Sequence, residues 1–120
     1  MSLLAVCFVA LVAIEHFYIL ILEMFLWTKP RTQKIFGFSQ DDAQRTVVFA
    51  ANQGLYNGFL AAGLLWGLVH SNSEFAEQIQ LFFLSCVIVA AIYGSFTVKR
   101  SILIVQGLPA LIALLLVLFT

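Results

Sequence analysis

Four long stretches of the chain are dominated by hydrophobic residues, and short polar segments separate them. The apolar stretches cover about residues 2–27, 46–69, 78–97 and 101–120. A transmembrane helix needs about 20 mostly apolar residues, so each stretch is long enough to cross a bilayer. The pattern predicts an all-α membrane protein, a four-transmembrane-helix bundle that forms a single domain over residues 1–120.

The composition also indicates a membrane protein. Hydrophobic residues make up 62% of the chain and charged residues 10%, and the mean hydropathy is +1.04. Soluble domains carry about 25% charged residues, so the lipid bilayer is the expected surrounding. The net charge is zero, which argues against nucleic acid as a partner. Cys7 and Cys86 have no metal-binding or disulfide spacing, and we interpret both as small buried hydrophobic residues.

The distribution of charge predicts the orientation in the membrane. All six Lys and Arg residues lie in segments 28–45 and 98–100, whereas segment 70–77 has none and carries Glu74 and Glu77. Cytoplasmic loops of membrane proteins are enriched in Lys and Arg. We therefore expect the two basic segments to be cytoplasmic and both termini to be extracytoplasmic.

Local signals predict where the helices begin and end. Pro30 is expected to end the first helix, because proline cannot donate a backbone hydrogen bond. Ser39, followed by two acidic residues, predicts an N-cap and a second helix that begins in water near Gln40. Ser71 and Glu74 have the spacing of a capping box at the start of the third helix.

Small residues recur at every fourth position in two of the apolar stretches. They are Ala50, Gly54, Gly58 and Ala62, then Gly63 and Gly67, and in the third stretch Cys86, Ala90 and Gly94. Small residues let membrane helices approach closely. We interpret these ridges as packing seams, chiefly between the second and third helices. The alternative is that they give backbone clearance for a ligand.

Three ionisable residues interrupt the first apolar stretch, which contains no Lys or Arg. Placing one such group at the centre of a bilayer costs about 2.5–3.5 kcal/mol on insertion scales. His16 and Glu23 share one helix face, while Glu15 lies about 100° around the helix from His16. These groups need polar partners from other helices, and an intramembrane ionisable residue indicates a functional site.

Amide and hydroxyl groups in the other stretches can supply those partners. If the second helix packs beside the first, its amides can reach the carboxyl groups of the first. The candidate ligand-binding or proton-handling residues are Glu15, His16, Glu23, Asn52, Gln53, Tyr56, Asn57, Tyr93 and Gln106.

The absence of a nearby cation shapes the expected chemistry. Burial favours the neutral form of the acids, or a proton shared with His16. This arrangement is typical of a proton relay, a proton-coupled transporter or a general acid/base pair. One histidine with carboxylates is a poor metal site, so we expect no metal and no cofactor. In the alternative interpretation, the polar groups form a closed hydrogen-bond network that only holds the helices together.

Several segments resemble a known family of proteins. They are EHFYI at 15–19, LEMFLW at 22–27, NQGLYNGFLAAG at 52–63, YG at 93–94 and QGLPA at 106–110. In these segments the chain resembles a family of small bacterial four-span integral membrane proteins of unknown function, whose members are sometimes labelled "epimerase". The resemblance covers nearly the whole chain and implies a four-helix bundle in the bacterial cytoplasmic (inner) membrane. In residue types alone, the chain is also similar to sterol-isomerase-type membrane proteins, and this similarity carries over no residue role.

We therefore expect a membrane protein whose protonatable polar pocket binds and transports a small or lipid-like molecule. Four helices seldom enclose a complete path, so a homo-oligomer is expected. One alternative is a membrane enzyme of isomerase or epimerase type that uses Glu15, His16 or Glu23 as acid or base. Another is a structural or regulatory membrane subunit.

Overall fold

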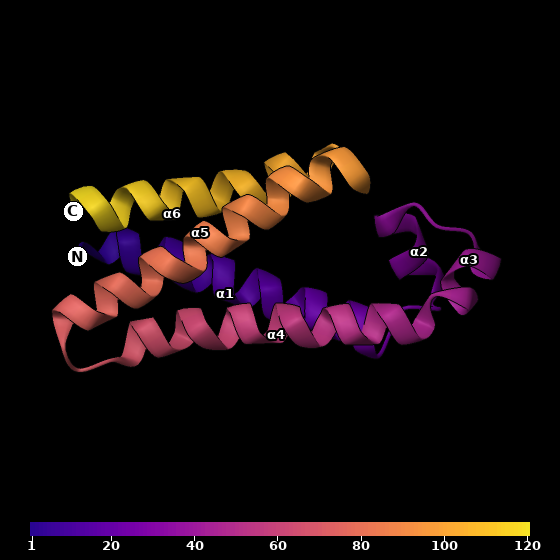
Figure 1. Cartoon of the computed structure of the whole chain (residues 1–120), viewed down its shortest axis with the longest axis horizontal. Helices are drawn as coiled ribbons and strands as arrows, with labels where there is room; N and C mark the ends of the chain where they lie inside the picture. Colours follow the sequence, from indigo (N-terminus) through magenta and orange to yellow (C-terminus); the bar gives the residue numbers. More distant parts are fainter.

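The structure, a computed structural model that describes all of residues 1–120, contains helices and no strands, which confirms the all-α class. Its elements in chain order are α1 (Leu3–Met24), α2 (Pro30–Phe36), α3 (Gln40–Arg45), α4 (Val47–Val69), α5 (Ser73–Thr97), the π-helical turn η1 (Leu103–Gly107) and α6 (Leu108–Phe119). The four long helices run side by side with alternating direction (Figure 1). Both termini and the α4–α5 turn lie at one end of the molecule, and α2 and α3 lie at the other (Figure 1).

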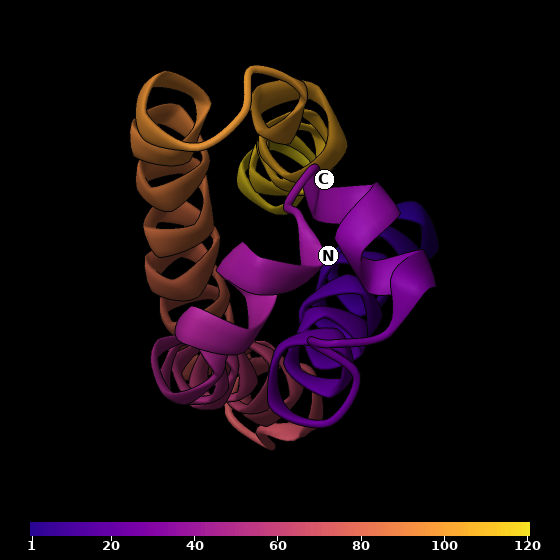
Figure 2. The ribbon, with the colours of Figure 1, turned by 90° about the vertical axis from the view of Figure 1, so that its right-hand side faces the viewer.

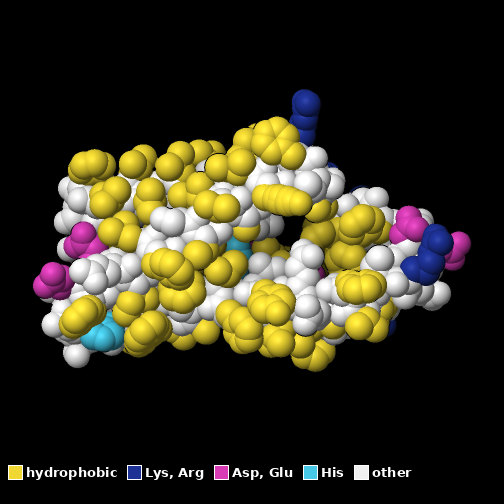
Figure 3. Space-filling model, in the orientation of Figure 1, with side chains coloured by type: hydrophobic (Ala, Val, Ile, Leu, Met, Phe, Trp, Pro, Cys, Tyr) yellow, Lys and Arg dark blue, Asp and Glu magenta, His cyan; other side chains and the backbone are white.

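Two helices, α1 and α5, are long and apolar enough to cross a membrane, judged by length and composition. The continuous segment Leu103–Phe119 forms a shorter apolar helix. Helix α4 has 23 residues and carries three amide side chains, Asn52, Gln53 and Asn57. Apolar side chains cover most of the face in Figure 3, and charged residues lie at its edges.

The four long helices form a closed ring in which α1 contacts α4, α4 contacts α5, α5 contacts α6, and α6 contacts α1. Viewed from the end that carries α2 and α3, these two short helices lie in front of the long ones (Figure 2). The main core fills the half of the bundle that contains the termini, which we call the packed half. Its buried residues are Ala5, Val9, Val12, Leu64, Leu84, Val87, Ala110, Ala113 and Val117.

The first small-residue ridge packs on α1, not on α5 as the sequence pattern suggested. A Cβ atom on Gly54 would lie 2.7 Å from Met24 Cγ and 3.0 Å from Glu23 Cβ. A Cβ atom on Gly58 would lie 2.5 Å from Leu20 Cδ1. The prediction of a seam with the third helix is therefore wrong at these positions, because the glycines of α4 pack against α1.

The second pair of glycines does form the predicted seam between α4 and α5. Gly63 faces the ring of Phe83, and a Cβ atom on Gly67 would lie 2.6 Å from Gln80 Cγ. Gln80 Nε2 also donates a 3.0 Å hydrogen bond to the carbonyl oxygen of Gly67. Close approach of the two helices is thus confined to the packed half.

The connection between α1 and α4 differs from the prediction at two points. Helix α1 ends at Met24, and Pro30 is the first residue of α2, where its missing N–H removes no helical hydrogen bond. Pro30 therefore starts a helix and does not stop one. The second predicted helix is divided at Thr46 into α3 and α4. The N-cap at Ser39 is confirmed, since its Oγ accepts a hydrogen bond from the backbone N–H of Asp42 at 3.1 Å.

Helix α5 begins within the predicted capping segment, but a different residue caps it. Asn72 Oδ1 accepts hydrogen bonds from the backbone N–H groups of Glu74 and Phe75, at 3.0 and 3.1 Å. Asparagine is as good an N-cap as serine, and here it lies one position closer to the helix. The helix therefore starts at Ser73, several residues before the predicted apolar span.

Candidate functional site

A cavity of about 640 Å³ lies in the half of the bundle next to α2 and α3, which we call the open half. Helices α4 and α5 meet near their connecting turn and diverge toward this end (Figure 1). The cavity occupies the resulting space and is lined by residues of α1, α2, α4, α5 and η1. Figure 3 shows a hollow between the α5 side and the α4 side of the molecule.

Glu23 provides the only carboxyl group in the lining, and it is 2% exposed. Gln53 Nε2 donates a hydrogen bond to Glu23 Oε2 at 2.9 Å, and Asn57 Nδ2 donates one to Glu23 Oε1 at 2.6 Å. Both amides lie on α4, one turn apart. The helices are close enough for these bonds because Gly54 has no side chain between them. The predicted contact between first-helix carboxylate and second-helix amides is confirmed.

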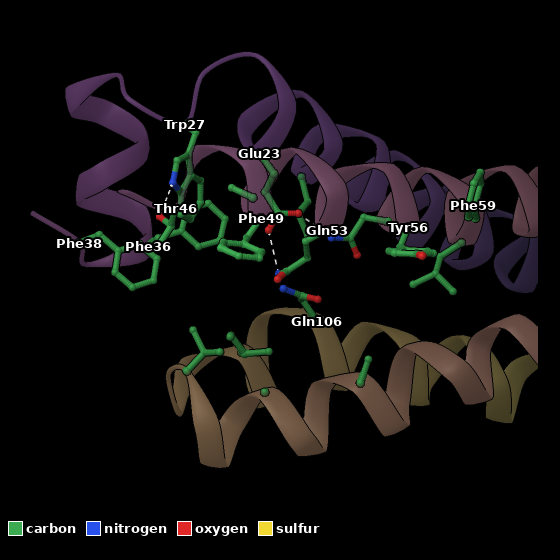
Figure 4. A pocket seen from close by; sticks show the side chains of 18 of the residues that line it. Glu23, Trp27, Phe36, Phe38, Thr46, Phe49, Gln53, Tyr56, Phe59 and Gln106 are labelled. Carbon is green, nitrogen blue, oxygen red and sulfur yellow. Dashed lines mark hydrogen bonds between the residues drawn. The ribbon is translucent and has the colours of Figure 1, made fainter. Parts of the chain in front are cut away.

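Gln106 approaches the same cavity from the opposite wall. It points from η1 toward the region of Glu23 and Gln53 (Figure 4), but no hydrogen bond joins it to either residue. The backbone N–H of Leu108 bonds the carbonyl of Leu103, five residues earlier, directly before Pro109. Such π-helical turns are rare and occur often at functional sites. Here the turn places an amide side chain in the wall of the cavity.

The ridge of small residues on α5 lines the cavity. Cys86, Ala90 and Gly94 all belong to its wall. For this ridge the alternative interpretation, backbone clearance around a space, describes the structure better than a helix seam. Cys7 is exposed on α1 and Cys86 is half-buried, so the prediction that both cysteines are buried is wrong.

Two ionisable residues of α1 lie outside the cavity lining. His16 is 1% exposed, and its Nδ1 lies 2.9 Å from the carbonyl oxygen of Val12, one turn earlier in the same helix. Glu15 is half-buried, and its Oε1 is buried without a hydrogen-bond partner. Neither residue shares a hydrogen bond with Glu23, so the three groups of the first helix do not form one cluster.

Two other predicted site residues face away from the cavity. Asn52 is exposed on α4, and Tyr93 is 60% exposed on α5. Each precedes a cavity residue, Gln53 or Gly94, by one position, which is about 100° around a helix. The structure therefore brings together five of the nine predicted residues. They are Glu23, Gln53, Tyr56, Asn57 and Gln106.

An aromatic group in the cavity lining was not predicted from the sequence. Trp27 is 9% exposed, and its Nε1 donates a 3.0 Å hydrogen bond to Thr46 Oγ1. Its ring centroid lies 5.0 Å from that of Phe36 and 5.3 Å from that of Phe38. The available signal was the group of aromatic residues between positions 25 and 38.

A second missed residue is Gln80, which is fully buried in the packed half. Its Nε2 donates a hydrogen bond to the carbonyl oxygen of Gly67, and its Oε1 has no hydrogen-bond partner. Gln80 lies four residues from both Ala76 and Leu84, which are buried, and this spacing could have placed it on the inner face of α5.

The fold and the cavity define an all-α protein with two helices apolar enough to cross a membrane and a partly polar space between its long helices. The chain belongs to the family described as "Protein of unknown function (DUF1304)", which matches residues 10–118. It is 33% identical over 117 residues to "Uncharacterized protein YpaA" of Lactococcus lactis subsp. lactis (strain IL1403), covering 96% of this chain and 97% of that relative. No solved structure matches the chain. The predicted membership of a family of unknown function, with a bacterial member, is confirmed.

Proposed function

We propose that this protein spans the bacterial cytoplasmic membrane four times and uses its cavity to bind and transport a small or lipid-like molecule. Four apolar segments that alternate in direction support four spans, and the apolar outer surface suits contact with lipid. All Lys and Arg residues belong to the segments at the end with α2, α3 and the α5–η1 turn. That end is then cytoplasmic, and both termini are extracytoplasmic.

The observation that carries the proposal is a buried carboxyl group facing a space large enough for a ligand. A network that served only to hold helices together would leave no such space beside Glu23. The volume of about 640 Å³ falls in the range of about 300–1,000 Å³ that small-molecule sites occupy. The hollow between α4 and α5 opens to the side of the bundle, so a lipophilic molecule can enter from the bilayer.

The arrangement favours binding and transport over acid/base catalysis. A general acid and base must both lie within reach of the reacting atoms. Apart from Glu23, the titratable residues of the lining are Tyr56 and Cys86, and Glu15 and His16 lie elsewhere. A homo-oligomer would complete a translocation path that one bundle of four helices does not enclose.

Native mass spectrometry of protein extracted from membranes tests the proposal. We expect a specific small molecule to remain bound to the wild type and to be lost from Glu23→Gln. Glu15→Gln is the matched control, because it makes the same change in the same helix outside the cavity, and we expect it to keep the ligand. Failure of the wild type to retain any molecule, or equal retention by both variants, contradicts a ligand site at Glu23.

The orientation has its own test. A reporter that is active only outside the cytoplasm, fused to the C-terminus, should be active. The same reporter inserted at Lys99 should be inactive. The reverse pattern, or activity at both positions, contradicts the proposed topology.

A further inference from the structure

Aromatic side chains surround much of the cavity that contains Glu23. Trp27, Phe36 and Phe38 contribute from the α1–α4 connection, and Phe49, Tyr56 and Phe59 contribute from α4 (Figure 4). The rings of Tyr56 and Phe59 form an edge-to-face pair with centroids 5.7 Å apart. The faces of aromatic rings carry partial negative charge, so they attract cations and disfavour anions.

No fixed positive charge lies in the lining to balance an ionised Glu23. Two of the basic residues at this end of the bundle have other partners: Lys99 Nζ donates to the carbonyl oxygen of Ile35 at 3.3 Å, and Arg45 pairs with Asp42 at 2.9 Å. The amides of Gln53 and Asn57 orient the carboxyl group but bring no charge. A carboxylate in a buried site needs a cationic partner.

The hydrogen-bonding capacity of Glu23 is also only partly used. Its two oxygens accept one bond each, and a carboxylate has about four lone-pair sites. Gln106 stands across the cavity without a bond to it. The unused acceptor positions of Glu23 therefore adjoin the cavity, and aromatic rings lie beside them.

We propose that the ligand of this cavity is a lipophilic organic cation, an amine or quaternary ammonium compound with an apolar body. Its charged group would lie between the carboxylate of Glu23 and the ring of Tyr56, and its apolar body would fill the space along Phe49 and Ala90. This inference rests on the proposed ligand-binding function and specifies the class of ligand. An anionic molecule would meet a carboxyl group and aromatic faces with no basic residue to hold it.

Binding of a cation in the cavity also affects the protonation of Glu23. A protonated Glu23 must release its proton to water when a monovalent cation binds, so that the cavity keeps the same net charge. The other titratable groups facing the cavity are Tyr56 on α4 and Cys86 on α5, and α2 and η1 contribute none. Cation binding and protonation of Glu23 therefore compete for one carboxylate, as an exchange of cation for proton requires.

Binding of two probes of matched shape tests the ligand class. Tetraphenylphosphonium is a cation, tetraphenylborate is an anion of the same shape, and equilibrium dialysis against the purified full chain in detergent measures both. We expect the cation to bind at least about tenfold more tightly than the anion. Glu23→Gln should remove this preference, whereas Glu15→Gln should keep it. Proton release on addition of the cation, measured in weak buffer, should be lost in Glu23→Gln alone.

A second variant keeps the test decisive if Glu23→Gln does not fold. Tyr56→Leu changes a residue that is 59% exposed and makes no hydrogen bond, so we expect it to fold and to bind the cation several-fold less tightly. Equal affinity for the two probes, binding of neither, or unchanged cation binding in both variants would overturn the inference. If a neutral or anionic molecule co-purifies with the wild type and is lost from Glu23→Gln, the ligand site stands and only the cationic class is rejected.

Discussion

The two halves of the bundle use the same four long helices in opposite ways. In the packed half, alanine, valine and leucine from all four helices fill the interior. In the open half, the space between α4 and α5 is lined by small residues on one side and by Glu23, its amide partners and aromatic rings on the other. Small residues let α4 and α5 approach closely where Gly63 meets Phe83 and Gly67 meets Gln80. Where α5 diverges from α4, its small residues leave the space open.

The α1–α4 contact runs through both halves and gives the open half a fixed wall. Gly54 and Gly58 continue the close approach of these helices up to Glu23. The α4–α5 contact, in contrast, is held at Gly63 and Gly67 in the packed half. The comparison indicates that the packed half supplies stability and that the open half supplies the proposed binding site.

Leu84→Ala should produce the largest loss of stability, because Leu84 is fully buried in the packed half. Removing a buried leucine side chain costs about 2–5 kcal/mol in known cores. Cys86→Ala, two positions along α5 in the cavity wall, should cost less than about 1 kcal/mol. Unfolding in mixed detergent micelles measures both free energies. Equal losses would mean that the open half is as tightly packed as the other.

Gly54→Leu should have the next largest effect, of about 1–3 kcal/mol, because its new side chain meets α1. The first added carbon already lies 2.7 Å from Met24 Cγ and 3.2 Å from the carbonyl oxygen of Leu20. Gly94→Ala in the open half is the control, since its Cβ would lie 3.4 Å from Ile102 Cγ2. Thermal unfolding should shift for the first variant and stay unchanged for the second. If Gly54→Leu unfolds at the same temperature as the wild type, α1 and α4 can separate to accommodate the new side chain.

Cysteine labelling gives a smaller contrast between the halves. Cys86 lines the cavity, whereas Cys7 lies on the exposed surface of α1 that we assign to lipid. Maleimides react with the thiolate, which needs a polar surrounding. In single-cysteine variants in lipid vesicles, we expect Cys86 to react about tenfold faster than Cys7. Faster reaction of Cys7 would contradict either the hydrated cavity or the lipid-facing surface.

Asn57→Ala should have the smallest effect on stability. Polar contacts between membrane helices contribute about 0.6 kcal/mol on average, with a maximum of about 1.7 kcal/mol. Asn52→Ala provides the matched control, because Asn52 is exposed on the same helix and makes no side-chain hydrogen bond. The same micelle unfolding experiment compares the two. A larger loss for Asn52→Ala would show that the outer face of α4 packs against another molecule.

Sequence reasoning located the central contact of the site but not its limits. The pair Gln53 and Asn57 was found because residues one turn apart on a helix share a face, and Glu23 was found because a carboxyl group stands out in an apolar stretch. Tyr93 could not be separated from the inward-facing Gly94 without knowing the rotation of α5 about its axis. Trp27 was missed because the residues that it packs with, Ala43 and Ala50, belong to helices α3 and α4 and lie 16 or more positions away.

By itself, the sequence determined the helical class, the four apolar segments and the uneven placement of basic residues, because these depend on local hydrophobicity and charge. Tertiary structure alone decided which helix packs against each glycine ridge and where α4 and α5 diverge. It also decided that His16 bonds its own helix and lies apart from Glu23. A helical pattern fixes which residues share a face, but the rotation and crossing of each helix fix what that face meets. The cavity exists because those rotations leave Glu23 beside the gap between α4 and α5.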